Sequence, residues 1–153
     1  MPSEAEPVRV GVRRLPEGEG LNFPAYMSAG AAGADVPAAV CSEITLAPGA
    51  RTLVPTGFSL AVPSGYEVQV RPRSGFALRS GVTVLNAPGT IDSDYRGPVG
   101  IILVNLGAEP VTIRRGDRIA QLVLAPVSRA TFDAEDEHAP TLRAAAGFGS
   151  TGA

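Results

Sequence analysis

Glycine and proline recur along the whole chain, and they limit the length of any regular element that it can form. The 18 glycines and 14 prolines make up more than a fifth of the 153 residues and are spread out instead of clustered. Between them lie short apolar segments, such as 66–70 (YEVQV), that alternate with the period of a β-strand. The sequence therefore predicts one domain of many short strands joined by tight turns.

The same turn signals give the positions of the expected elements. The segment 26–36 (YMSAGAAGADV) is too rich in glycine for a stable helix and too small-sided for a core strand. A single helical turn fits at 74–80 (SGFALRS), and the absence of tryptophan predicts a core of Val, Ile, Leu and Ala. The strands that we expect are 8–15, 43–46, 51–55, 57–62, 66–70, 82–85, 99–104, 111–113 and 119–127.

Composition and charge argue against several kinds of partner. The formal net charge of −2 argues against a nucleic-acid polymer. No run approaches the roughly 18 apolar residues of a membrane span, and the N-terminus lacks the apolar stretch of a signal peptide, so a cytoplasmic location is expected. Cys41 is the single cysteine, which excludes a disulfide framework. All 13 basic residues are arginines, which suit bidentate phosphate contacts but can equally reflect genome composition.

The stretch 82–105 carries the strongest functional signal. Two β-rich arms, 82–85 and 99–104, flank a core of turn formers and acids, which predicts a hairpin with Asp92 and Tyr95 at its tip. These two side chains would face opposite sides of a regular strand. A turn or bulge at Ser93-Asp94 would place both in one pocket. The alternative is a solvated hairpin tip that has no catalytic or binding role.

Three further segments carry groups that can hold phosphate. The strand 66–70 runs into Arg71-Pro72-Arg73-Ser74-Gly75, where guanidinium, hydroxyl and exposed amide groups make a small anion site. Gln121 is the one polar residue in the apolar strand 119–127, so it needs partners from protein or ligand. The tail 143–153 (RAAAGFGSTGA) cannot pack by itself, and it is either a disordered end or a flexible flap that orders over a ligand.

Five segments, in order, resemble the conserved motifs of the trimeric dUTPase family (deoxyuridine triphosphate nucleotidohydrolases). They are AGAD at 32–35, PRSG at 72–75, NAPGTIDSDYRG at 86–97, GDRIAQL at 116–122 and RAAAGFGSTG at 143–152. The resemblance spans roughly residues 8–152. It departs from the family pattern where Ala144 and Ala146 replace glycines, and an alanine forced into a left-handed backbone would cost about 1–2 kcal/mol.

The resemblance implies an all-β, jelly-roll-like β-barrel or sandwich that assembles as a homotrimer, with a flexible C-terminal arm exchanged between subunits. Residues 1–142 would form the β domain with its arm, and residues 143–153 a flap that closes an active site lying between subunits. The implied reaction is Mg²⁺-assisted hydrolysis of dUTP to dUMP and pyrophosphate, by attack of water on the α-phosphate. That reaction keeps uracil out of DNA and supplies dUMP for thymidylate synthesis.

The family motifs also imply a role for each matching residue. Asp92 would act as general base or orient the attacking water. Asp117 would pair with an arginine for structure, either within the chain or across a subunit boundary. Asp35 would help to hold Mg²⁺ through a water, the alternative being a turn aspartate that satisfies backbone amides. Substrate contacts are expected from Arg73, Ser74, Gly75, Asn86, Gly89, Thr90, Ile91, Tyr95, Gly100, Gln121, Arg143, Phe148, Gly149 and Ser150.

Two other functions are compatible with parts of this pattern. The dCTP deaminases share the fold and several motifs, but that family typically has a catalytic glutamate on the strand after the third motif. Residues 98–105 (PVGIILVN) contain no acid. A non-enzymatic nucleotide-binding or regulatory trimer would keep the motifs without turnover, and the altered tail leaves that alternative open.

Overall fold

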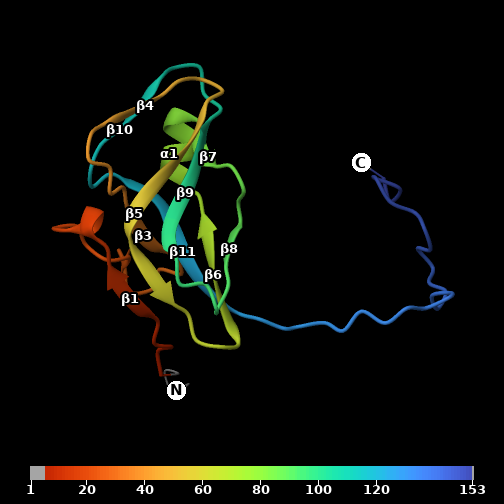
Figure 1. Ribbon diagram of the computed structural model, residues 1–153. Helices are drawn as coiled ribbons and strands as arrows, with labels where there is room; N and C mark the ends of the chain where they lie inside the picture. Colours follow the sequence, from red (N-terminus) through yellow and green to blue (C-terminus); the bar gives the residue numbers. More distant parts are fainter. Residues whose placement is uncertain (1–5, 153) are drawn as a thin grey trace.

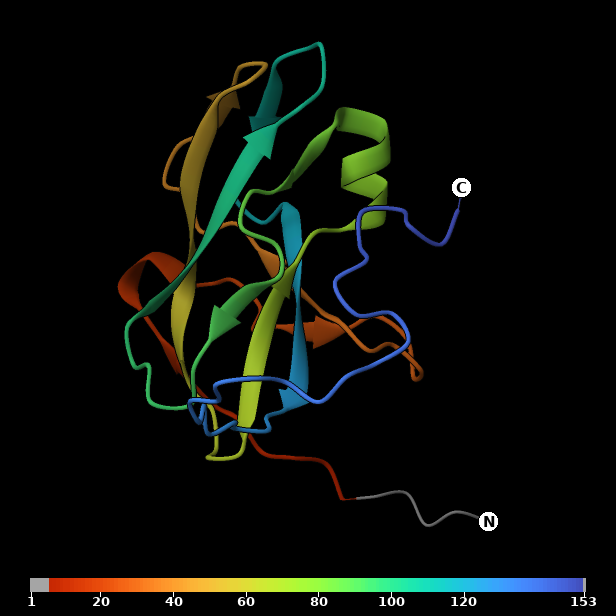
Figure 2. The same ribbon diagram turned by 90° about the vertical axis from the view of Figure 1, so that its right-hand side faces the viewer.

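The computed structural model describes residues 6–152, and its body consists of two β-sheets packed face to face (Figures 1 and 2). The sheets have the orders β1-β5-β9-β7 and β2-β3-β11-β6-β8, and a two-stranded ribbon, β10-β4, lies at the same end of the body as helix α1. All pairings are antiparallel, so the predicted all-β sandwich is confirmed. The elements are β1 (Gly11–Arg14), η1 (Pro16–Gly18), β2 (Ala25–Tyr26), β3 (Ala34–Pro37), β4 (Ile44–Leu46), β5 (Arg51–Ala61), β6 (Tyr66–Arg71), α1 (Ser74–Ser80), β7 (Val82–Val84), β8 (Gly89–Ile91), β9 (Pro98–Asn105), β10 (Val111–Ile113) and β11 (Arg118–Pro126).

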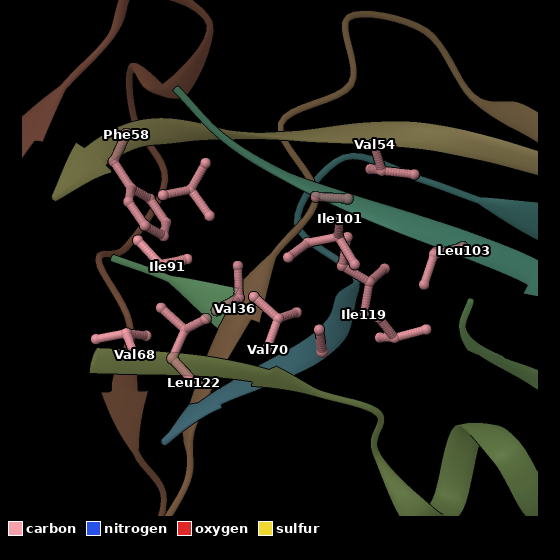
Figure 3. Packing of buried hydrophobic residues seen from close by; sticks show 14 of the residues in the cluster. Val36, Val54, Phe58, Val68, Val70, Ile91, Ile101, Leu103, Ile119 and Leu122 are labelled. Carbon is pink, nitrogen blue, oxygen red and sulfur yellow. The ribbon is translucent and has the colours of Figure 1, made fainter. Parts of the chain in front are cut away.

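The core lies between the two sheets and is largely aliphatic, as the composition predicts (Figure 3). Val54 and Ile101 of the four-stranded sheet face Val70 and Leu122 of the five-stranded sheet, and Phe58 adds an aromatic ring. All five side chains are buried. Burial of side chains of this size contributes about 1.5–3 kcal/mol each, so this interface is the main source of stability in the body.

Strand β5 runs continuously where the sequence predicts two strands, 51–55 and 57–62. Its register against β9 shifts in the middle, and Gly57 takes a left-handed φ of 78° there. A Cβ atom on Gly57 would lie 2.3 Å from the α-carbon of Gly18. The irregularity in β5 therefore depends on glycine at both positions, which let the two backbones approach closely.

Two N-terminal predictions are wrong in detail. Strand β1 covers only part of the predicted strand 8–15, because its partner β5 ends at Ala61, opposite Gly11. The segment 26–36 does contain core strand residues, since Val36 of β3 is fully buried. The backbone of β3 pairs with β2 and β11, and this pairing keeps the segment in the sheet although its side chains are small. The size of the side chains alone does not predict such a pairing.

The hairpin predicted at 82–105 is present, and it contains an additional strand. Strands β7 and β9 pair with Val82 opposite Asn105. Between them, β8 crosses to the other sheet and pairs with β6, so that Ile91 lies opposite Val68. The hairpin therefore connects the two sheets, and Asp92 follows directly after β8.

After β11 the chain leaves the body as an extended arm (Figure 1). Residues 127–152 form no helix or strand, and the side chains of Phe132, Leu142 and Phe148 are almost completely exposed. Apolar side chains in this state add no burial energy to the chain that carries them. Within residues 6–152, neither helix has the length and apolar character that a membrane span needs.

The buried side chain of Asn105 joins three segments at the end of β9. Its Nδ2 donates to the carbonyl oxygens of Leu46 and Glu109 at 2.9 and 2.8 Å, and its Oδ1 accepts from the amide of Gly107 at 2.9 Å. The side chain is fully buried. Its hydrogen bond to Leu46 is buried and the other two are partly buried, so water can replace them only in part.

We expect Asn105→Ala to lower the free energy of unfolding by about 2–4 kcal/mol, because two carbonyls and one amide lose their buried partner. Chemical denaturation at fixed protein concentration measures the change. Asn22→Ala is the matched control, since Asn22 is exposed. Equal destabilisation by the two variants would contradict the structural role of Asn105.

Candidate active site

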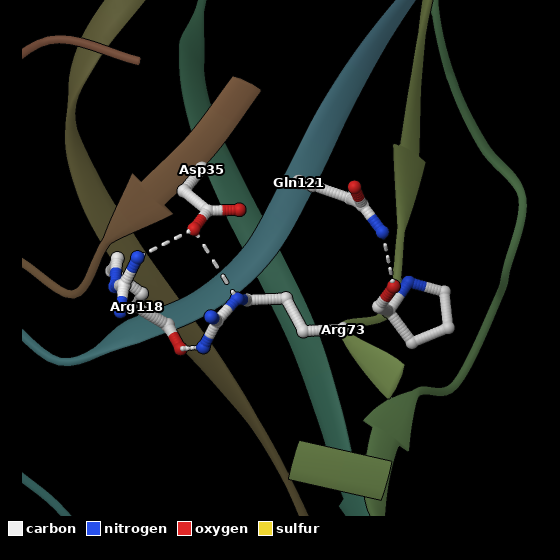
Figure 4. A network of polar contacts seen from close by, with 5 residues as sticks. Asp35, Arg73, Arg118 and Gln121 are labelled. Atoms are coloured by element: carbon white, nitrogen blue, oxygen red, sulfur yellow. Dashed lines mark hydrogen bonds and ion pairs between the residues drawn. The ribbon is translucent and has the colours of Figure 1, made fainter. Parts of the chain in front are cut away.

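The site begins at Asp35, which lies on β3 opposite Gln121 of β11. The Oδ2 atom of Asp35 is 3.0 Å from Nη1 of Arg118 and 3.5 Å from Nε of Arg73 (Figure 4). The Asp35 side chain is 12% exposed, whereas those of Arg73 and Arg118 are 26% and 49% exposed. One shielded carboxylate is thus shared by two more accessible guanidinium groups.

Backbone contacts fix the arginines and the glutamine around this carboxylate. Arg73 Nη1 donates to the carbonyl of Arg118 at 3.1 Å, and Gln121 Nε2 donates to the carbonyl of Pro72 at 2.9 Å (Figure 4). A Cβ atom on Gly33 would lie 2.0 Å from Gln121 Oε1, so a larger residue there would displace the Gln121 side chain from its present position. Three of the five sequence motifs therefore meet at this edge of the five-stranded sheet.

Helix α1 places Ser74 and Gly75 beside this cluster. The helix starts at Ser74, and the first helical hydrogen bond runs from the amide of Ala77 to the carbonyl of Arg73. The amides that precede Ala77 have no helical acceptor, as in any first helical turn. The helix expected at 74–80 is confirmed, with seven residues where the sequence predicts a single turn, and Ser74 and Gly75 form its first turn directly after Arg73.

Within residues 6–152, Asp117 forms no ion pair with an arginine side chain, and its pairing across a subunit boundary stays a prediction. Its Oδ2 accepts a hydrogen bond from the backbone amide of Arg114 at 2.7 Å, which makes it a turn carboxylate. The carboxylate that pairs with arginine side chains is Asp35. Sequence reasoning missed Arg118 as a member of the cluster, although it lies in the GDRIAQL motif, because only the β3–β11 pairing brings it to Asp35.

The tip of the long hairpin contains the predicted turn at Ser93-Asp94. The amide of Tyr95 donates to the carbonyl of Asp92 at 3.2 Å, which closes the turn. The hydroxyl of Tyr95 donates to the carbonyl of Pro98 at 2.9 Å. Asp92 and Tyr95 are both exposed, so the turn presents a carboxylate and an aromatic ring at the surface.

Asp92 does not lie beside the arginine cluster of its own chain. Ile91 is opposite Val68 on β6, whereas Arg73 lies five residues further along the same stretch. At about 3.3 Å per residue, the stretch from Val68 to Arg71 alone spans roughly 10 Å. Asp92 lies on the Tyr66 side of Val68, further still from Arg73. One chain therefore provides the parts of a site at two places.

The residues expected to contact the base lie along β8, β9 and the loop between β7 and β8. Asn86, Thr90 and Gly100 are exposed. The Asn86 side chain lies next to Gly89, since a Cβ atom added to Gly89 would be 3.2 Å from Asn86 Nδ2. Gly89 and Ile91 are buried, and the Ile91 side chain packs in the core. Any contact between Ile91 and a ligand must therefore come from its backbone.

The expected residues of the tail lie away from the body, on the extended arm (Figure 1). They are Arg143, Phe148, Gly149 and Ser150. Arg143 Nε donates to the carbonyl of Ala146 at 2.8 Å, and the amide of Ser150 donates to the carbonyl of Gly147 at 3.1 Å. The tail has local turns but is not folded over the arginine cluster.

Metal-ligating side chains are sparse in this site. Within residues 6–152, no group of three or more His, Cys, Asp or Glu side chains is placed to hold a metal ion. Asp35 is a single carboxylate among arginines. This donor set fits Mg²⁺ that is held mainly by substrate phosphates and waters, and it does not fit an all-protein cage.

The fold and the site together define an all-β protein with a cationic edge suited to a polyphosphate. A family model described as dUTPase matches residues 20–152. Deoxyuridine 5'-triphosphate nucleotidohydrolase of Methylocella silvestris is 60% identical over 151 residues, which cover 97% of this chain and 94% of that protein. The protein of the same name from Desulfotalea psychrophila is 59% identical over 136 residues, covering 89% and 91%. The chain belongs to the dUTPase family.

Solved structures agree on the fold. A mutant dUTPase of Staphylococcus bacteriophage 80alpha with dUpNHpp superposes with a TM-score of 0.83 at 23% identity, covering 95% of this chain and 99% of that one. A mutant dUTPase from phage phi11 of S. aureus, which reveals the coordination of a structural Mg(II) ion, gives a TM-score of 0.76 at 22% identity, covering 85% and 98%. At such identities the likeness concerns the fold alone.

Proposed function

We propose that this protein hydrolyses dUTP to dUMP and pyrophosphate, acting in the cytoplasm on the nucleotide pool. The observation that carries the proposal is the meeting of Arg73, Arg118 and Gln121 around Asp35 at one sheet edge. Guanidinium groups bind phosphate oxygens through short, charge-assisted hydrogen bonds. Together with family membership, this edge supports a triphosphate substrate.

Asp92 acts as the general base or orients the attacking water. As the water oxygen bonds to the α-phosphorus, its proton passes to the carboxylate, and the bond to the α–β bridging oxygen breaks to release pyrophosphate. Arg73, the Ser74 hydroxyl, the Ser74 and Gly75 amides, and Gln121 stabilise the charge on the phosphate oxygens. Positioning and charge stabilisation supply most of the rate in such phosphoryl chemistry.

Mg²⁺ is the cofactor that the donor set supports, with Asp35 contacting it through a water. The bound ion would neutralise charge on the leaving pyrophosphate. In the phage phi11 relative a structural Mg(II) ion is coordinated. Both arginines contact the Oδ2 atom of Asp35, so its Oδ1 atom is the one that would face a water on the cation.

The active site is completed by other copies of the chain, in a homotrimer. Asp92 lines a hollow with Tyr66 at the start of β6, whereas Arg73 follows the other end of that strand, so the two side chains do not face one site within a chain. The arm also extends away from its own body with Phe132 and Phe148 exposed (Figure 1). Both observations are explained when the hairpin tip and the tail serve sites on neighbouring subunits.

The hairpin selects the base and the sugar. Uracil pairs with the side chain of Asn86 and with backbone groups. Those backbone groups belong to Gly89, Thr90, Ile91 and Gly100. Cytosine presents a donor where the site requires an acceptor, and mispaired polar groups discriminate more strongly than a lost methyl contact. Tyr95 lies against the deoxyribose and leaves no room for a 2′-hydroxyl. In the cell this specificity would keep uracil out of DNA and supply dUMP for thymidylate synthesis.

The test is release of pyrophosphate from dUTP, dCTP, dTTP and UTP, with Mg²⁺ and then with EDTA. Release from dUTP alone, lost or strongly reduced in EDTA, is the expected result. Tight dUTP binding without pyrophosphate release would refute the enzyme and indicate a binding protein. Ammonia from dCTP would indicate a deaminase instead.

The tail residue Ala144 has a left-handed backbone, with φ 44°. Residues other than glycine pay about 1–2 kcal/mol for this conformation. If the closed flap keeps it, Ala144→Gly should lower KM for dUTP about 3–10-fold, although the greater freedom of the open tail offsets part of the gain. Steady-state kinetics measure the change, with Ala130→Gly in the arm as control. An unchanged or higher KM would show that the closed flap does not need this backbone.

A further inference from the structure

Arg79 lies over the start of helix α1, next to the predicted phosphate-binding groups. A Cβ atom on Gly75 would be 3.0 Å from Arg79 Nη1 and 3.2 Å from Nη2. Long helical side chains lean toward the helix N-terminus and cover the residue four positions earlier, which explains this contact. The guanidinium group of Arg79 therefore lies beside Gly75, although its Cα lies near the other end of the helix.

The same guanidinium group lines a hollow with the other two arginines of the site. The hollow has a volume of about 360 Å³ and is lined by Arg73, Arg79 and Arg118 together with Phe76, Thr112 and Asp117. It is open at the surface and continuous with the cluster around Asp35 through Arg73 and Arg118.

The charges around this hollow are not balanced. Asp35 is shared by Arg73 and Arg118, and Asp117 accepts from a backbone amide. Within residues 6–152, Arg79 forms no ion pair with an acidic side chain. Three guanidinium groups thus stand against the two carboxylates of Asp35 and Asp117, so the hollow has a net positive charge that attracts an anion.

We propose that Arg79 binds the terminal phosphate of the nucleotide and so favours triphosphates over nucleotides with fewer phosphates. The proposal rests on the proposed function. A terminal phosphate carries close to two negative charges near neutral pH, whereas an inner phosphate of the chain carries one. The place with the highest density of guanidinium groups therefore suits the terminal group best. Neither the PRSG nor the GDRIAQL motif contains Arg79, so the sequence motifs give no signal for it.

The experiment compares wild type, Arg79→Gln and Arg79→Lys in their affinity for dUpNHpp, dUMP and tripolyphosphate, by calorimetry with Mg²⁺. Arg79→Gln should weaken dUpNHpp and tripolyphosphate about 5–20-fold and change dUMP less than about twofold, as for loss of one charge-assisted hydrogen bond. Arg79→Lys should recover part of the loss, because it keeps the charge but not the fork of donors. The control is Arg13→Gln, which makes the same charge change on the exposed edge strand β1.

Equal weakening of dUpNHpp and dUMP in Arg79→Gln would overturn the proposal, because it would indicate a structural role. Unchanged dUpNHpp affinity, or an equal loss in Arg13→Gln, would also overturn it. Failure of the proposed function gives a different result from failure of the Arg79 proposal: wild type would release no pyrophosphate from dUTP. In that case a selective loss of tripolyphosphate affinity in Arg79→Gln would still support the anion contact.

Discussion

Asp92→Asn should lower kcat for dUTP by about two to four orders of magnitude, the range of general base catalysis. Asparagine matches the shape of aspartate but cannot take the proton of the attacking water. The fold should be unaffected, because the Asp92 side chain is exposed and the turn is closed by its backbone carbonyl, which accepts from the amide of Tyr95. Affinity for dUpNHpp should change little, since the phosphate contacts come from Arg73 and its neighbours.

The matched control for this variant is Asp94→Asn. It makes the same chemical change two residues away, in the same exposed turn. Pyrophosphate release and dUpNHpp binding are measured side by side for both variants. If Asp94→Asn lost as much turnover as Asp92→Asn, the general charge of the tip would matter, and Asp92 would have no special role. A loss of binding that matched the loss of turnover would assign Asp92 to binding instead.

The sequence predicts the strands well where alternation and turn residues agree. The strand predicted at 111–113 is present as β10 with the same bounds, and β6 differs from its prediction by one residue. The errors occur where strand pairing decides the outcome. Strand β8 was not predicted because its three residues, Gly89–Ile91, have no pattern of their own and become a strand only by pairing with β6. Local propensity carries no information about such a partner.

The candidate site shows the same limit. Motifs locate Asp35, Arg73 and Gln121 in the sequence, but their meeting depends on the register that places Asp35 opposite Gln121. The ion pair between Asp35 and Arg118 spans 83 positions of the chain. Sequence spacing therefore predicts which residue types are present, and only the sheet shows which carboxylate holds which arginine.

The position of Asp92 has a consequence for assembly. The hairpin tip and the arginine cluster lie at different places on one body, and the tail lies on an arm that points away from both (Figure 1). The three groups of residues to which we assign the proposed site therefore lie apart in the free chain. Closed symmetry solves this problem, because each copy can supply its parts to a neighbour and receive the matching parts in return.

Removing residues 143–153 should lower kcat/KM for dUTP by at least about 100-fold while leaving the body folded. The effect is large because Arg143, Phe148 and Ser150 are lost together, and with them the cover that excludes water from the phosphates. Phe148 is fully exposed in the free chain, so its removal costs the body no packing. Thermal unfolding should keep its midpoint within a few degrees of wild type, and a truncated protein that fails to fold would contradict this account.

Mixing the truncated chain with Asp92→Asn tests whether the tail and Asp92 serve one site from different chains. Each variant alone should be almost inactive. In mixed trimers, some sites combine Asp92 from a truncated chain with the tail of an Asp92→Asn chain, so activity should return to a substantial fraction of wild type. Differently tagged chains, co-expressed and purified over both tags, supply trimers that all contain both variants, in the ratios 2:1 and 1:2. If these show no more activity than the two parents, the tail and Asp92 act within one chain, and sharing of the site between subunits is wrong.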